Sequence, residues 1–331
     1  MQSKTKNRIT MEQIKELVSE KFDGVELAEL YELKEGLFNS AYFLKGNGVF
    51  QNGAVLKIGP SPNTYTLTYE QEIMKAEIEV YNLLKNKNIP VPTILASDTS
   101  KEKYPFDYFF MSFMEGKTWR TSRKAVKENR DKLMHELGRY NAVVHSIQGE
   151  YFGYIKEAPR FRHKTWDKAF IGMIEDILND GKHLGCKLPY DQILMTVKEY
   201  RDVLAEVLEP TLVIYDMWAG NIFISENNVN TSITGFIDFE RAFWGDPLAD
   251  FTSATMIFDD VEQEREFIKG YEEQQQRPLS IGKSERIRMN LYKLYLALII
   301  HIETYRYPML IAKAIQSNSR KTITKLLNVI M

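Results

Sequence analysis

The stretch LVIYDMWAGNIFI, residues 212–224, and the stretch ITGFIDFERAFWGDPLADF, residues 233–251, decide the fold. Each contains an apolar run that ends in an isolated carboxylate, Asp216 in the first and Asp238 in the second. One amide, Asn221, follows Asp216 by five residues. A single Asp at such a point is ordinarily a turn or cap residue. Three polar side chains in one short region call for a common explanation.

A hairpin would bring these polar groups together. Residues 222–225 and 233–237 have the composition of two strands joined by a polar turn. Asn221 and Asp238 flank this hairpin, so we expect them to be neighbours. Carboxylate and amide oxygens placed side by side suit Mg²⁺, a hard ion that also binds phosphate. Asp216, on the preceding loop, would then face the group that receives the phosphate.

Helical spacing predicts a second charged pair. In the helix expected over residues 69–86, Glu77 falls on the same face as Ile73 and Val80, inside the apolar stripe. A buried carboxylate needs a cation, and Lys57 in the apolar strand AVLKIG has the complementary need. We expect the two to pair. The alternative is that the lysine extends to the sheet edge and the glutamate lies at the rim of the stripe.

Composition excludes several classes of protein. The chain has 331 residues, 44% hydrophobic, with 43 basic and 45 acidic side chains, which argues against a dedicated nucleic-acid binder. The most apolar run, LYLALIIHI at 294–302, is far shorter than the roughly 20 residues that span a bilayer. A single cysteine, Cys186, excludes an intramolecular disulfide and fits a cytoplasmic location. We expect a small-molecule partner, without nucleic acid or membrane.

The order of elements predicts two lobes. Thr10 and Gln13 form a capping box for a first helix, and short β-rich runs then predict an antiparallel meander. After the helix over 69–86, a hairpin with KEKYPFD at its tip ends near Glu115 and Gly116, where the composition changes to helix. We place the lobes at 1–114 and 115–331. Long helical patterns are expected at 128–147, 166–180, 190–207, 261–275 and 284–305.

These motifs, taken together, resemble the aminoglycoside phosphotransferase and choline kinase family, small-molecule kinases with a protein-kinase-like fold. The resemblance rests on Lys57, the helix MKAEIEVYNLLKNKNIPVPTIL, the hinge FFMSFMEG, the helix end LGRYNAVVHSI and the two segments quoted first. It covers most of residues 25–255. It implies an α+β, bilobal fold, with a small N-terminal antiparallel sheet and helix above a larger, mainly helical lobe.

The resemblance also implies a role for each matching residue. Lys57 would bind the α and β phosphates of ATP or GTP, with Glu77 orienting it, and Ser112 and Met114 would offer backbone groups to the base. Asp216 would be the catalytic aspartate that orients or deprotonates the attacking hydroxyl. Asn221 and Asp238 would be the Mg²⁺ ligands.

Two positions depart from the family pattern. Ile214 stands where the family has a histidine with a scaffolding role, so we expect weaker support of the catalytic loop. The phosphate-covering turn LKEGLFNSAYFL has one glycine, Gly36, instead of a glycine-rich run. Backbone amides near Phe38, Asn39 and Ser40 can still cradle phosphate.

The implied activity is transfer of the γ-phosphate of ATP or GTP to a hydroxyl of a small molecule, such as an aminoglycoside. One alternative is a metabolite kinase of the choline, ketosamine or sugar type, and Trp218 in DMWAGN resembles the ketosamine kinases. Another is a pseudoenzyme that binds nucleotide without turnover. A protein kinase is disfavoured, since only twelve positions separate Asp238 from Asp250 and leave no room for a long activation loop.

The remaining polar residues predict structural roles. The histidines show no pair at metal-ligand spacing, so no zinc site is expected. Asp246 and Asp250 are expected to fasten the loop after Asp238 and the helix that follows.

Overall fold

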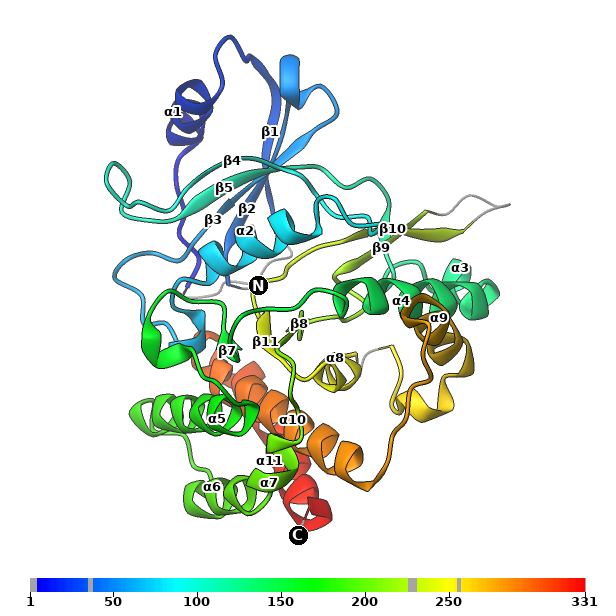
Figure 1. The fold of residues 1–331 in the computed structure, drawn as a ribbon. Coiled ribbons are helices and arrows are strands. Elements are labelled where there is room, and N and C mark those ends of the chain that lie inside the picture. Colours follow the sequence, from blue (N-terminus) through cyan, green and yellow to red (C-terminus); the bar gives the residue numbers. More distant parts are fainter. Residues whose placement is uncertain (1–4, 35–37, 226–230, 255–256, 331) are drawn as a thin grey trace.

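The amino-terminal part of the chain forms a five-stranded antiparallel sheet in the order β1-β2-β3-β5-β4 (Figure 1). The structure, a computed structural model, describes residues 5–34, 38–225, 231–254 and 257–330. The expected meander and the following hairpin are both present. The strands are β1 (Leu27–Leu33), β2 (Ser40–Gly46), β3 (Ala54–Ile58), β4 (Ile94–Asp98) and β5 (Tyr108–Ser112).

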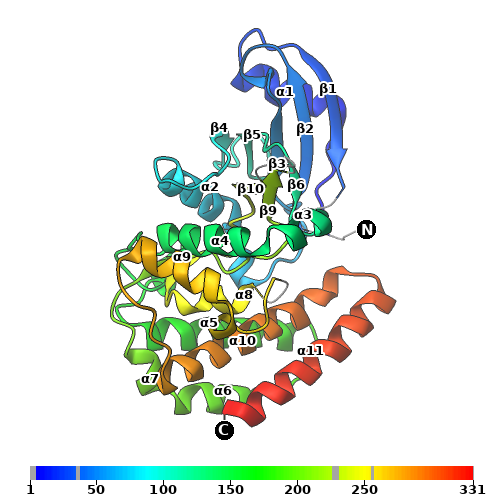
Figure 2. The same ribbon diagram turned by 90° about the vertical axis from the view of Figure 1, so that its right-hand side faces the viewer.

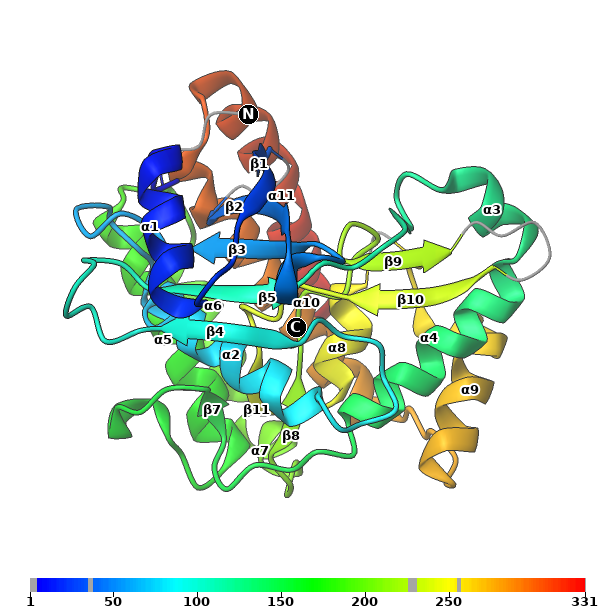
Figure 3. The same cartoon turned by 90° about the horizontal axis from the view of Figure 1, so that it is seen from above.

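Both faces of this sheet are covered, which explains why β3 is buried along its whole length. Helix α1 (Met11–Lys21), with the predicted capping box, packs on the face that carries Leu56 (Figure 3). Helix α2 (Ile73–Leu84) lies on the other face, between the sheet and the rest of the molecule (Figure 1). Because side chains alternate along a strand, Val55 and Lys57 point toward α2.

The rest of the chain is mainly helical. Figure 2 shows α4 beside α9, and α10 packs against α5, α8 and α11. The fold is therefore bilobal and α+β, as the sequence predicts. The helices are α3 (Arg123–Glu128), α4 (Arg130–Val144), α5 (Trp166–His183), α6 (Tyr190–Glu199), α7 (Arg201–Ala205), α8 (Leu248–Ser253), α9 (Arg265–Gln275), α10 (Lys283–Ile302) and α11 (Met309–Ile330).

Two small antiparallel sheets lie next to α2 and the helices (Figure 1), and the segments that contain Asp216, Asn221 and Asp238 directly adjoin their strands. One has the order β10-β9-β6 and contains the predicted hairpin; the other has the order β7-β11-β8. Their strands are β6 (Lys117–Thr118), β9 (Ile222–Ser225), β10 (Ser232–Phe236), β7 (Gly153–Tyr154), β8 (Thr211–Val213) and β11 (Phe243–Gly245).

Some helix boundaries differ from those expected. Helix α2 begins at Ile73 because Glu72 has a left-handed backbone (φ 61°), and a 3-10 turn at Thr68–Glu70 precedes it. The single helix expected over 190–207 is two helices, divided at Tyr200, whose hydroxyl donates to the carbonyl of Ile330. Helix α11 was not anticipated.

The connection between the lobes requires a glycine. Gly116 has φ +122°, and a Cβ there would lie 2.8 Å from the carbonyl oxygen of Ile224. The backbone of this connection therefore lies directly against β9. Among the described residues, no helix combines the length and apolar character needed to cross a bilayer.

Candidate active site

Lys57 and Glu77 form the ion pair expected from helical spacing. Lys57 Nζ lies 2.6 Å from Glu77 Oε2 and 2.6 Å from Asp238 Oδ1. Lys57 is 8% exposed and Glu77 is fully buried, so the lysine does not extend to the sheet edge. Strand β3, helix α2 and the segment after β10 each contribute one of these charges. The site therefore lies where the small lobe meets the larger one.

Glu240 joins this cluster, and the sequence analysis missed it. Its Oε2 atom lies 3.2 Å from Lys57 Nζ and accepts a hydrogen bond of 2.8 Å from Asn39 Nδ2. Asn39 was expected to offer its backbone amide to phosphate, but here its side chain binds Glu240. Glu240 lies two residues after Asp238, beyond the end of β10, and Asp238 has a left-handed backbone (φ 69°), so no strand or helix periodicity in the sequence indicates that the two side chains meet.

Burial and mutual repulsion shift the pKa values of these groups. Burial alone would lower the pKa of Lys57, but Asp238, Glu77 and Glu240 outweigh it and raise that pKa well above its usual value. Burial and repulsion from Asp238 raise the pKa of Glu240. Burial raises the pKa of Glu77 as well. One ammonium is therefore not enough to stabilise three carboxylates in their ionised form.

The donor set fits a divalent cation. Ligand oxygens of Glu77, Asp238 and Glu240 lie within 4.8 Å of one another. Glu77 Oε1 is buried and makes no hydrogen bond with the described part of the chain. Three carboxylates share one lysine here, and a divalent ion bound among them would stabilise their ionised forms. The oxygen-only donors suit Mg²⁺ better than zinc.

The hairpin places Asn221 beside the same cluster. The amide of Ile237 donates to the carbonyl of Asn221 at 3.0 Å, so the residues that flank the hairpin are neighbours. Asn221 Nδ2 donates to the backbone carbonyl of Asp216 at 3.0 Å and lies 3.3 Å from Asp216 Oδ2. The amide nitrogen of Asn221 thus holds the loop, which leaves its Oδ1 atom as the candidate metal ligand.

Asp216 has a second partner that the sequence analysis did not identify. Arg241 Nη1 donates to Asp216 Oδ1 at 3.2 Å. Burial raises the pKa of Asp216 to about 6, although the Arg241 guanidinium opposes the shift. The carboxylate is therefore ionised near neutral pH and remains close to the range in which it can accept a proton.

The loop that leads to Asp216 is held in place although position 214 is an isoleucine. Asp250 accepts hydrogen bonds from the amides of Ile214 (3.1 Å) and Tyr215 (2.6 Å), and His145 Nε2 lies 3.0 Å from Asp250 Oδ2. Tyr215 has φ 56°, a strained conformation for a bulky residue, immediately before Asp216. Asp250 thus fastens the loop before Asp216, whereas the sequence analysis assigned it to the loop after Asp238.

The residues predicted to contact the nucleotide base and phosphates make hydrogen bonds and packing contacts within the protein. The amide of Ser112 donates to the carbonyl of Thr93, so a contact from Ser112 to a base would use its carbonyl oxygen. The side chain of Met114 packs over Gly235 in β10. Ser40 is fully buried and its hydroxyl donates to the carbonyl of Asn7. Gly36 lies outside the described residues.

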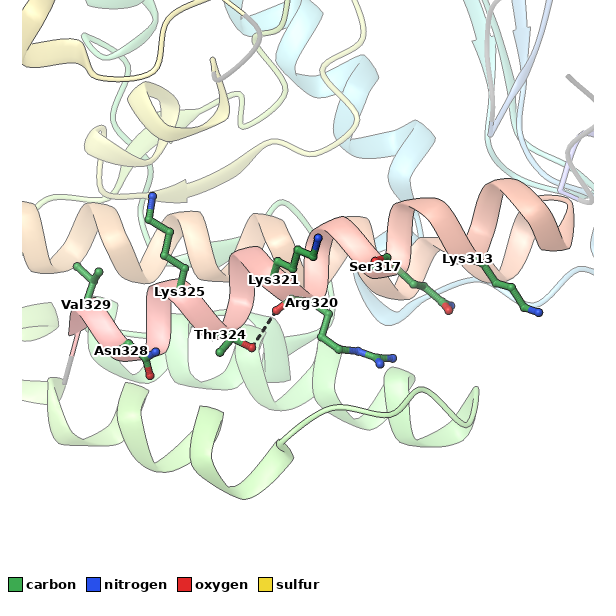
Figure 4. A pocket seen from close by; sticks show the side chains of 9 residues that line it. Lys313, Ser317, Arg320, Lys321, Thr324, Lys325, Asn328 and Val329 are labelled. Atoms are coloured by element: carbon green, nitrogen blue, oxygen red, sulfur yellow. Dashed lines mark hydrogen bonds between the residues drawn. The ribbon is translucent and has the colours of Figure 1, made fainter.

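A groove elsewhere on the molecule is separate from this cluster. It has a volume of about 810 Å³ and is lined only by residues of α11, among them Lys313, Arg320, Lys321 and Lys325 (Figure 4). None of the residues expected to act in catalysis lines it.

The sequence identifies the family. Residues 29–283 match the phosphotransferase enzyme family, APH. The chain belongs to this family, and it is a small-molecule kinase by class.

Solved structures agree with the fold. The chain is similar to a protein from Thermobifida fusca YX-ER1 described as a fructosamine-3-kinase candidate, with 17% identity, TM-score 0.68, and coverage of 96% of this chain and 100% of that one. It is also similar to aminoglycoside phosphotransferase APH(2″)-IIa in a ternary complex with streptomycin and ATP, with 18% identity, TM-score 0.59 and 97% coverage of each chain. A third is a thermostable mutant of aminoglycoside phosphotransferase APH(4)-Ia with AMP-PNP and hygromycin B, with 17% identity, TM-score 0.63, and coverage of 95% of this chain and 97% of that one.

Proposed function

We propose that this protein transfers the γ-phosphate of ATP or GTP to a hydroxyl of a small molecule. The observation that carries the proposal is the Lys57 cluster, in which a strand lysine contacts Glu77 of α2 and Asp238 after the hairpin at 2.6 Å each. Asp216 and Asn221 lie on the adjoining loop, where the Asn221 side-chain amide donates a hydrogen bond to the Asp216 carbonyl. Residues 1–114 form the nucleotide lobe in this proposal, and residues 115–331 the catalytic and acceptor lobe.

Each residue has a role in the reaction. Lys57 binds the α and β phosphates, and Glu77 holds its ammonium in place. Ser112 and Met114 offer backbone groups to the base, and the turn near Asn39 and Ser40 covers the phosphates. Positioning of this kind supplies most of the catalysis in phosphoryl transfer.

Asp216 acts on the acceptor. The acceptor hydroxyl oxygen forms the new bond to the γ-phosphorus, the bond from that phosphorus to the β–γ bridging oxygen breaks, and ADP or GDP leaves with the electron pair. The hydroxyl proton passes to an Asp216 oxygen. Asn221 and Asp238, with Glu240 beside them, would hold Mg²⁺, which neutralises charge on the phosphates when it is bound.

The support of the catalytic loop favours an active enzyme over a pseudoenzyme. The sequence analysis expected Ile214 to weaken the loop, but Asp250 holds the two amides that precede Asp216. We therefore rank the pseudoenzyme below the kinase.

The acceptor class rests on the similar structures. Two of them hold streptomycin or hygromycin B, and the third is associated with fructosamine. We propose an aminoglycoside-type acceptor, with a ketosamine, choline or sugar as the alternative. The single cysteine supports a cytoplasmic location.

The test is release of ADP or GDP by the purified protein with Mg²⁺. The acceptor panel contains aminoglycosides, choline, ketosamines and sugars, and Asp238→Ala is the control. We expect release that depends on one acceptor class and is absent in the control. If no acceptor supports release and no Mg²⁺-dependent nucleotide binding is found, the kinase proposal is wrong.

A further inference from the structure

Buried charges connect the catalytic loop to the segment after α10. Arg241 Nη1 donates to Asp216 Oδ1 at 3.2 Å, and Arg241 Nη2 donates to Glu303 Oε1 at 2.8 Å. Glu303 begins the 3-10 turn Glu303–Arg306 and is 5% exposed. It lies outside residues 29–283, the part that matches the family. A residue beyond the family match therefore holds the arginine that contacts Asp216.

Glu303 is itself held on several sides. The hydroxyl of Tyr69 donates to Glu303 Oε1, and Arg306 Nη2 lies 3.6 Å from the same oxygen. Arg306 also pairs with the buried Glu70. Burial alone would raise the pKa of Glu303, but Arg241 and Arg306 hold it below its usual value. Glu303 is therefore a fixed, ionised anchor.

The same group of contacts reaches the phosphate-covering turn. The guanidinium of Arg306 lies 4.9 Å from the centre of the Phe38 ring. Phe38 precedes Asn39, whose side chain donates to Glu240. Glu303 thus lies between the catalytic loop and the segment expected to cover the phosphates.

We propose that Glu303 is a positioning residue for phosphoryl transfer, because it holds Arg241 and thereby fixes the orientation of the Asp216 carboxylate. The inference rests on the proposed function, which gives Asp216 its role toward the acceptor. A guanidinium is planar and rigid, so when one Nη is fixed on Glu303 the position of the other is fixed too. A shift of the catalytic group by about 1 Å can reduce the rate by about 10²-fold.

A purely structural role has to be separated from positioning. Glu303→Gln keeps the shape of the side chain and removes the charge that holds Arg241. Glu70→Gln is the matched control, since Glu70 is equally buried and contacts Tyr69 and Arg306. Arg241 has contacts to Asp216 and Glu303 rather than to Glu70.

The first readout is the crystal structure of Glu303→Gln with AMP-PNP and Mg²⁺, which needs no turnover. We expect Arg241 to leave its position and the Asp216 carboxylate to change its rotamer relative to the parent protein. An unchanged Arg241 and Asp216 would overturn the inference.

The second readout is steady-state kinetics with MgATP, using water as the acceptor and then the best acceptor of the panel. Glu303→Gln should lower kcat about 10- to 100-fold while the KM for ATP stays within about twofold. Glu303→Asp should recover part of the loss, and Glu70→Gln should keep kcat within about twofold. If both Gln variants lose kcat equally, Glu303 is only structural and the inference is wrong.

The two proposals fail in different ways. A parent protein that turns over no nucleotide with any acceptor contradicts the proposed function, while the crystal structure still decides whether Glu303 positions Asp216. If Glu303→Gln does not fold, Arg241→Lys tests the same link, because lysine keeps the charge but cannot bridge both carboxylates. We expect the same loss of kcat from Arg241→Lys, and parent-like kcat would overturn the inference.

Discussion

The Lys57 cluster and the Arg241 network are two groups of buried charges that differ in how far their carboxylates are compensated by cations. Around Lys57, one ammonium meets three carboxylates, and Glu77 Oε1 makes no hydrogen bond within the described chain. Around Arg241 and Arg306, two guanidiniums meet Asp216, Glu303 and Glu70 in alternation. The first group needs added positive charge, so it suits cation and phosphate binding. The second has most of its charge compensated internally, so it suits holding a side chain still.

The largest effect on turnover is expected at Asp216, which contacts Arg241 and lies near the Lys57 cluster. Asp216→Ala should lower turnover by about 10²–10⁴-fold, because it removes the group that orients the acceptor and takes its proton. The measurement is the steady-state rate of ADP release. A rate within about tenfold of the parent, a difference of ~1.4 kcal/mol, would show that Asp216 is not the catalytic residue.

Removal of the Lys57 ammonium tests how far the Lys57 cluster depends on its single cation. Lys57→Met should lower the free energy of unfolding by about 3–5 kcal/mol, because it leaves buried carboxylates without their cation. Urea unfolding followed by circular dichroism measures this change. Lys124→Met is the control, since the Lys124 side chain is 89% exposed and its loss should leave the midpoint unchanged. Equal midpoints for both variants would contradict the account of this cluster.

Glu240 tests whether the charge excess serves metal binding. Glu240→Gln should raise the Mg²⁺ concentration needed for half-maximal turnover by about 10- to 100-fold. A titration of the rate with Mg²⁺ at saturating ATP measures this. Glu70→Gln, which changes a carboxylate of the balanced network, should leave the Mg²⁺ requirement unchanged. If the two variants shift it equally, the two groups do not differ in metal binding.

The smallest effect comes from pH. Asp216 has a pKa raised to about 6, and only its ionised form can accept the acceptor proton. Turnover should therefore fall as the pH decreases, reaching about half of its maximum near pH 6. The profile of kcat from pH 8 to 5 measures this in a protein that stays folded. A rate that does not change with pH across this range would show that Asp216 is not the proton acceptor.

Local patterns in the sequence were enough for a large part of the fold and of the pairing. The spacing of Glu77 within its apolar stripe and the isolated Lys57 in an apolar strand predict the ion pair that the structure has. The hairpin that joins Asn221 to Asp238 follows from strand and turn composition. These predictions succeed because the periodicity of apolar residues is a local property of the sequence.

The contacts of Glu240, Arg241 and Glu303 could not be read in this way. Arg241 and Glu303 are 62 residues apart, and nothing near either one indicates the other. The contact between Asp250 and the Ile214 amide is equally remote, since the two residues are 36 positions apart in the sequence. Such contacts depend on how helices pack after they form.

The sequence by itself determined the class of the protein and the order of its elements. It also determined which charges need partners, because a carboxylate or ammonium buried without one is energetically costly. The Lys57–Glu77 pair could be predicted from the sequence, but only the tertiary structure decided the further partners of each charge. Lys57 is close enough to meet three carboxylates, and Arg241 bridges Asp216 and Glu303, because packing brings β3, α2, the hairpin and the end of α10 to one place.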